Sequence, residues 1–189
     1  MNKLVLALTV VWVAATPAAA QNLVVNGGFE TGTIAGWTLT GNTNQSVVSP
    51  GAFGGNFYYG NGAPSSNAFL SQTVATTAGT RYQFSFGLFN AGGTPNRFSV
   101  SIGGTAFGPT FVDAVAFDYT IFTGFVIAPT SNATLTFTFR HDPHFWALDE
   151  VSLVAAPVPE PANWALMLCG GFGIAGASLL RRKKSKSIR

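Results

Sequence analysis

The sequence predicts an all-β protein folded as a two-sheet sandwich, with an apolar helix at each end of the chain. Apolar residues alternate with polar ones in residues 21–156, turn residues separate the alternating segments, and no helical stripe interrupts them. Of the 189 residues, 47% are hydrophobic and only 9% are charged. This composition excludes a disordered chain. The single cysteine excludes an intrachain disulfide scaffold and a Cys-based zinc cluster.

The first segment, residues 1–20, has the three parts of a secretory signal peptide. Lys3 supplies the positive charge, residues 4–15 are apolar, and small residues ending at Ala20 precede a cleavage site at Gln21. We therefore expect the Sec translocon to export the rest of the chain.

Residues 21–156 follow as one predicted β-sandwich domain. Apolar side chains occupy every second position in residues 82–88, 98–102 and 135–139, so one face of each strand lies in a core and the other in water. Clusters of Gly, Pro and Asn divide the domain into about nine or ten short strands, which is typical of a two-sheet sandwich.

The charge of this domain differs from that of the whole chain, which is +3. Between residues 21 and 161 three arginines face seven acids, so the formal charge there is −4. Nucleic-acid binding would need a basic stripe on the folded part, and the composition excludes it.

Residues 162–180 form an uncharged apolar run, which as a helix would be about 28 Å long and would cross a membrane. The tail, residues 181–189, is basic, which anchors that side in the cytoplasm. We expect a precursor held in the inner membrane with its domain in the periplasm. The cations that stop the span are Arg181, Arg182, Lys183 and Lys184.

A proline-rich motif precedes the span and reads Val158, Pro159, Glu160, Pro161, then Trp164 and Ala165. With the apolar run and the basic tail, residues 157–189 resemble the PEP-CTERM sorting signal of Gram-negative bacteria, in its PEPxxWA variant. The resemblance implies recognition by an exosortase at residues 158–165, removal of the span, and delivery to the cell surface or the medium. It also implies a link with exopolysaccharide export and biofilm.

The domain itself resembles carbohydrate-binding-module-like and galactose-binding-like jelly rolls. The similar segments follow in the same order along the chain: residues 22–30, 36–37, 70–74, 80–86 and 148–153. The resemblance implies that the sandwich is a jelly roll.

Asp149 shares its strand phase with Val151 and Leu153, which predicts a carboxylate directed toward the core. A buried carboxylate needs a partner. One interpretation is a pair with Arg140, or simple exposure at a sheet edge. The other is a structural Ca²⁺ held by Asp149, Glu30 and loop carbonyls, as in the jelly-roll relatives that the domain resembles. Either arrangement would tie the first and last strands together.

Aromatic residues near predicted loops could form a sugar-binding platform, because a ring stacks on the C–H face of a sugar. The alternative is that these rings fill the core. The candidates are Tyr58, Tyr59, Phe145 and Trp146.

Three classes of function remain. An enzyme is disfavoured, because Asp113 and Asp118 would lie on opposite faces of a strand and no Gly-x-Ser-x-Gly or HExxH motif is present. Residues 141–144 pair two histidines around a proline, which predicts a turn rather than a helical metal site. We expect a non-catalytic module that binds or structures polysaccharide; a self-assembling coat protein is the alternative.

Overall fold

The computed structural model describes residues 21–157, which contain ten β-strands joined by loops and no helix. The all-β prediction is confirmed for this part of the chain. The predicted signal peptide, sorting motif, membrane span and basic tail lie outside the described residues. Within residues 21–157 no helix is long and apolar enough to cross a membrane.

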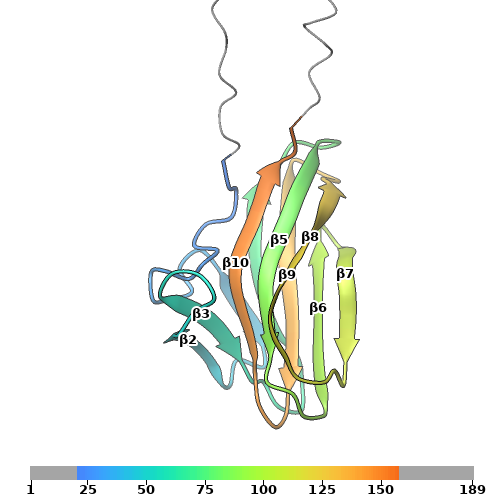
Figure 1. The fold of residues 1–189 in the computed structure, drawn as a ribbon. Helices are drawn as coiled ribbons and strands as arrows, with labels where there is room; N and C mark the ends of the chain where they lie inside the picture. The colour runs from blue at the N-terminus through green and yellow to red at the C-terminus, as the bar shows by residue number, and fades with distance from the viewer. Residues whose placement is uncertain (1–20, 158–189) are drawn as a thin grey trace, which may run out of the picture. The chain divides into compact units, whose positions relative to one another are not determined.

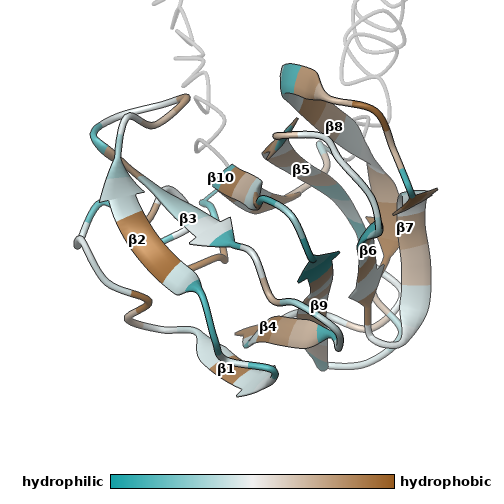
Figure 2. Cartoon of the chain, turned by 90° about the horizontal axis from the view of Figure 1, so that it is seen from below, coloured by the Kyte–Doolittle hydropathy of each residue, from teal (hydrophilic) through white to brown (hydrophobic). Residues whose placement is uncertain are grey.

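The strands form two five-stranded antiparallel sheets that pack face to face (Figures 1 and 2). We name each sheet after its central strand. The β9 sheet contains, in spatial order, β1 (Thr38–Gly41), β4 (Ala68–Ala75), β9 (Asn132–His141), β6 (Asn96–Ile102) and β7 (Thr105–Val112). The β10 sheet contains β2 (Ser46–Pro50), β3 (Phe57–Asn61), β10 (Trp146–Ala155), β5 (Arg81–Asn90) and β8 (Phe117–Ile127).

An aromatic core fills the space between the sheets, as the alternating pattern predicts. Phe137 and Phe139 of β9 are fully buried, and Phe86 of β5 packs edge-on against Phe137 with ring centroids 5.5 Å apart. Phe98 of β6 packs against Phe139 at 5.3 Å. Their alternate neighbours on β9 are only part-buried, so β9 presents a polar outer face.

The two ends of the described segment lie beside each other. Asn22 forms an isolated antiparallel bridge with Val154, and the Leu23 N–H donates to the Leu153 carbonyl oxygen at 2.9 Å. In Figure 1, β10 ends at the top of the sandwich, whereas β9 ends and β6 begins at the bottom. The ends of the segment are therefore at the opposite end of the sandwich from the β9–β10 turn.

Candidate functional site

A cleft of about 560 Å³ lies on the outer face of the β9 sheet, near the ends of β9 and β7. The strand register builds the first row of its floor. Phe69 of β4 lies opposite Thr138 of β9, and Thr138 lies opposite Ser99 of β6. All three side chains are part-exposed. The row therefore places one aromatic ring beside two hydroxyl groups.

The second row of the floor lies two residues further along each strand. Arg140 of β9 lies opposite Arg97 of β6, which lies opposite Val112 of β7. The Arg140 guanidinium makes two bonds to Asp142, Nε to Oδ1 at 2.8 Å and Nη2 to Oδ2 at 3.1 Å. This contact raises the pKa of Arg140 and holds the pKa of the Asp142 carboxyl below its usual value.

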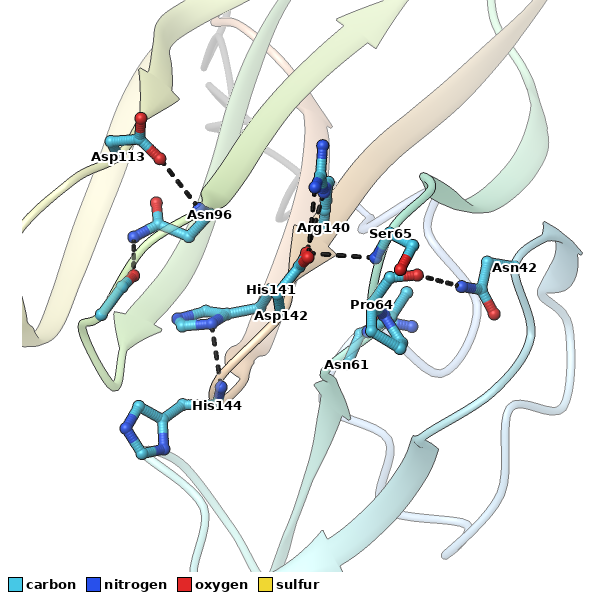
Figure 3. Close-up of polar contacts among 12 residues, drawn as sticks. Asn42, Asn61, Pro64, Ser65, Asn96, Asp113, Arg140, His141, Asp142 and His144 are labelled. Carbon is cyan, nitrogen blue, oxygen red and sulfur yellow. Dashed lines mark hydrogen bonds and ion pairs between the residues drawn. The ribbon is translucent and has the colours of Figure 1, made fainter.

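Side-chain-to-backbone hydrogen bonds fix the loops around the cleft (Figure 3). Asp142 Oδ1 also accepts the Ser65 N–H at 3.1 Å, and Asp113 Oδ1 accepts the Asn96 N–H at 3.1 Å. The Asn96 amide in turn donates to the Ala114 carbonyl oxygen at 2.8 Å and accepts the Ala114 N–H at 3.0 Å. The loops before β4 and after β7 are thus tied to the sheet that carries the cleft.

Gly41 of β1 makes room for the aromatic ring of the cleft. Its φ is +73°, and a Cβ at this position would lie 2.9 Å from the Phe69 ring and 2.5 Å from the Asn67 carbonyl oxygen. Only glycine combines this backbone conformation with such close contacts. The ring can therefore lie over β1.

The predicted turn at residues 141–144 is confirmed by its hydrogen bonds. His141 is fully buried, its Nδ1 accepts the His144 N–H at 3.1 Å, and its Nε2 lies 3.0 Å from Asn90 Oδ1. With Nδ1 accepting, Nε2 carries the proton and donates to Asn90. Burial lowers the pKa of His141 to about 4. His141 is therefore a neutral residue that holds the β9–β10 turn in place.

Asp149 is buried, but not in the way that its strand phase predicts. A β-bulge follows it, with Glu150 at φ +51°, and Asp149 lies opposite Gly87 on the outer face of the β10 sheet. Asp149 Oδ2 accepts the N–H groups of Phe53 and Gly54 at 3.0 and 2.9 Å. Burial raises the pKa of Asp149.

Two interpretations of Asp149 are therefore wrong. It does not pair with Arg140, which binds Asp142 instead, and it is not at a sheet edge, because β10 is the central strand of its sheet. The bulge inverts the alternation, so the carboxylate lies beneath the loop that joins β2 to β3 rather than in the core.

Glu30 holds the other side of the same loop. Its Oε1 accepts the N–H groups of Asn56 and Phe57 at 2.8 and 2.9 Å, which keeps the pKa of Glu30 below its usual value. The two carboxylates that the sequence pairs in a calcium site thus bind adjacent segments of the β2–β3 loop. They do not join the first and last strands directly.

Three acidic side chains converge on Gly28. A Cβ at this glycine would lie 3.4 Å from Glu150 Oε1, 3.7 Å from Glu30 Cγ and 3.8 Å from Asp149 Oδ1. Carboxylate oxygens are the ligands that Ca²⁺ takes, so the donor chemistry fits this ion. In residues 21–157, however, no group of three or more His, Cys, Asp or Glu side chains is already arranged to hold a metal. The structural calcium stays a prediction.

The model of a family described as a carbohydrate binding domain matches residues 21–149, more than half of the chain. The chain belongs to this carbohydrate-binding family. No curated protein sequence matches it.

Solved structures show the same fold at low sequence identity. The module TmCBM61, solved with β-1,4-galactotriose, is 19% identical with a TM-score of 0.58, and the match covers 72% of this chain and all of that one. The CBM22-1 xylan-binding domain of Paenibacillus barcinonensis Xyn10C is 18% identical with a TM-score of 0.51, covering 76% and 100%. The K3 adhesin domain of Lys-gingipain from Porphyromonas gingivalis is 14% identical with a TM-score of 0.52, covering 73% and 100%.

The four predicted platform residues of this carbohydrate-binding domain do not lie together. Tyr59 and Trp146 are fully buried, so the prediction is wrong for these two, and the Trp146 indole N–H donates to the Arg140 carbonyl oxygen at 3.0 Å. Tyr58 and Phe145 do stack, with ring centroids 6.4 Å apart, on the outer side of the β10 sheet. They border a hollow of about 420 Å³.

The cleft contains residues that the sequence did not single out as ligands, namely Phe69, Arg97, Ser99 and Thr138. Each is an outward residue of a regular strand, and nothing in the local sequence distinguishes it from its neighbours. Asp113 and Asp118, the acids of the disfavoured catalytic pair, are not on one strand. Asp113 lies in the turn after β7 and borders the cleft, whereas Asp118 belongs to β8 of the other sheet.

Proposed function

We propose that this domain binds glycan in the cleft of the β9 sheet and does not turn it over. The observation that carries the proposal is the part-exposed Phe69 ring beside the Thr138 and Ser99 hydroxyls, in a member of a carbohydrate-binding family. The ring would stack on the C–H face of a sugar, while hydroxyl and guanidinium groups bind the sugar hydroxyls.

The outer face of the sheet offers room for further sugar units. The next row along the strands consists of Ser71, Thr136 and Ser101, which lie opposite one another. Beyond it, the hydroxyls of Thr73 and Thr134 are 2.9 Å apart. A glycan chain that leaves the cleft along the strands would therefore meet hydroxyl-bearing side chains rather than an apolar surface.

The acids at the cleft support binding rather than hydrolysis. A glycosidase needs a general acid whose pKa is raised, so that it carries a proton near neutral pH. The contact with Arg140 lowers the pKa of Asp142 instead. The carboxylate of Asp113 is engaged with the Asn96 N–H in the loop after β7. These groups hold the walls of the cleft in place.

The test is affinity electrophoresis or calorimetry of the purified domain on β-1,4-galactan and xylan, the glycan types named for two modules of the same fold. Phe69→Ala should lower the affinity about fivefold, since stacking one ring is worth about 1 kcal/mol. Phe125→Ala is the matched control, because Phe125 is 53% exposed on β8 of the other sheet. Release of sugar by the wild type would overturn the non-catalytic assignment.

A second variant tests where glycan binds. If Tyr58→Ala abolishes binding and Phe69→Ala does not, the ring pair of Tyr58 and Phe145 is the site and the cleft proposal is wrong. If Phe69→Ala alone abolishes binding, the cleft is the site.

We also propose that the domain is exported, processed by an exosortase and delivered to the cell surface or the medium, where it binds exopolysaccharide. The order of the signal peptide, domain, Pro-Glu-Pro motif, apolar run and basic tail supports this. Intact-mass analysis of protein from its native cells tests it. We expect a mature form that begins at Gln21 and ends near Pro161; a form that retains Arg189 would contradict processing.

A self-assembling coat protein is the second candidate function. It is favoured by apolar side chains exposed on the outer face of the β10 sheet, such as Val47 at 53% and Ile127 at 65%. The middle of β2, which carries Val47, is coloured as hydrophobic in Figure 2. Analytical ultracentrifugation separates the two functions, because a coat protein would form large assemblies without glycan.

A further inference from the structure

Cations are scarce in the described part of the chain, and the cleft collects most of them. Residues 21–157 contain three arginines and no lysine. Two of the three, Arg97 and Arg140, lie directly opposite each other on β6 and β9 and line the cleft. Like charges directly opposite each other destabilise a sheet. An anionic ligand in the cleft would offset that repulsion.

The two guanidinium groups differ in what they already bind. Arg140 uses Nε and Nη2 for Asp142. That contact is the only ion pair within residues 21–157, so Arg97 has no carboxylate partner in the described part of the chain. Arg97 is also exposed to solvent. Its planar fork of N–H donors is available to a ligand in the cleft.

We infer that the cleft binds acidic glycans, with the carboxylate of a uronic acid unit on Arg97. The inference rests on the proposed function and adds the class of sugar. Arg97 lies in the row beside that of Phe69, about 7 Å along the strands and, because β9 lies between β4 and β6, about 10 Å across the sheet. A glycan chain stacked on Phe69 and running across the sheet would thus place the carboxylate of a neighbouring unit toward Arg97.

Other charges around the cleft limit how much affinity an acidic glycan gains over a neutral one. The charge of Asp142 is already matched by Arg140, whereas Asp113 borders the cleft and opposes an anion. The gain must therefore come from the geometry of the contact. A guanidinium binds a carboxylate through two parallel N–H···O bonds, which a spherical ammonium cannot reproduce. We expect a preference of about tenfold for an acidic over a neutral glycan of the same backbone.

The test uses polygalacturonate and its fully methyl-esterified form, which share a backbone and differ in charge. Wild-type protein at low salt should bind polygalacturonate about tenfold more tightly. Arg97→Gln should abolish this preference, and Arg97→Lys should reduce it, because lysine keeps the charge but not the fork. Arg81→Gln is the matched control: it removes the same charge from the other sheet, where Arg81 lies 3.7 Å above the Phe125 ring.

The outcomes separate this inference from the proposed function. If both forms of the polymer, or only neutral glycans, bind in a Phe69-dependent way without the preference, the acidic-glycan inference is overturned and glycan binding stands. If no glycan binds at all, both fail. If dextran sulfate binds more tightly than polygalacturonate, or if Arg81→Gln weakens binding as much as Arg97→Gln, general charge and not the Arg97 fork is responsible, and the inference is again overturned. Thermal unfolding of each variant confirms that it is folded.

Discussion

The Oδ2 atom of Asp149 accepts the backbone N–H of Gly54 at 2.9 Å, which joins two residues 95 positions apart in the chain. The same oxygen accepts the Phe53 N–H, and Oδ1 accepts the Glu150 N–H at 2.8 Å. Three backbone donors thus solvate a carboxylate that is fully buried. The hydrogen bonds from Phe53 and Gly54 to this carboxylate hold the β2–β3 loop against the outer face of β10.

Replacing Asp149 with alanine should release this loop. We expect Asp149→Ala to lower the free energy of unfolding by about 2 kcal/mol, because two loop N–H groups lose a charged acceptor. Urea denaturation followed by tryptophan fluorescence measures the change. Asp118→Ala is the control, since Asp118 is exposed and should change stability by less than about 0.5 kcal/mol. Equal effects of the two substitutions would contradict the role given to Asp149.

Calcium should stabilise the domain if the acidic side chains around Gly28 hold it. We expect the Tm to rise in 1 mM CaCl₂ relative to EDTA, because an ion that binds only the folded state adds to its stability. Equal concentrations of MgCl₂ should have a smaller effect, since Mg²⁺ demands a stricter octahedral geometry. Glu150→Gln should reduce the shift. An identical Tm in CaCl₂ and EDTA would rule out a calcium site of this kind.

His141 should remain neutral in the folded protein down to about pH 4. In the unfolded chain its pKa is about 6.5, so the unfolded state binds more protons between these values. The contribution of His141 to stability is therefore fully present above about pH 6.5 and falls as the pH drops toward 4. NMR titration of the imidazole resonances tests this. A midpoint near pH 6.5 for His141 would show that its ring is not held as the structure indicates.

Gly41→Ala should impair glycan binding through Phe69. The new Cβ would meet the ring, which must then move from its place in the cleft. Gly51→Ala is a matched control, because Gly51 also has a positive φ, +100°, but nothing lies within 4 Å of its Cβ position. The backbone conformation should make each substitution cost about 1 kcal/mol in stability, and Gly41→Ala should cost more because its Cβ would also meet the Asn67 carbonyl oxygen. Only Gly41→Ala should weaken binding to the glycan that wild-type protein prefers, and a similar loss in Gly51→Ala would refute the argument.

The sequence by itself determined the class of fold. The alternation of residues such as Phe84 and Phe86, or Phe137 and Phe139, is a local signal, because side chains of any strand point alternately to its two faces. The clusters of turn residues predicted the number of strands closely, and the count of charged residues established the acidic character of the domain. It also identified the turn at residues 141–144.

Only the tertiary structure decided the site. Phe69, Ser99 and Thr138 become neighbours because β4, β9 and β6 pair in one register, and strand order and register depend on packing between residues far apart in the chain. The bulge at Glu150 then moved Asp149 to the opposite face from the one that a regular period predicts. Because register decides which face of a strand is buried, the sequence could not tell that Tyr58 is part-exposed while its neighbour Tyr59 is fully buried.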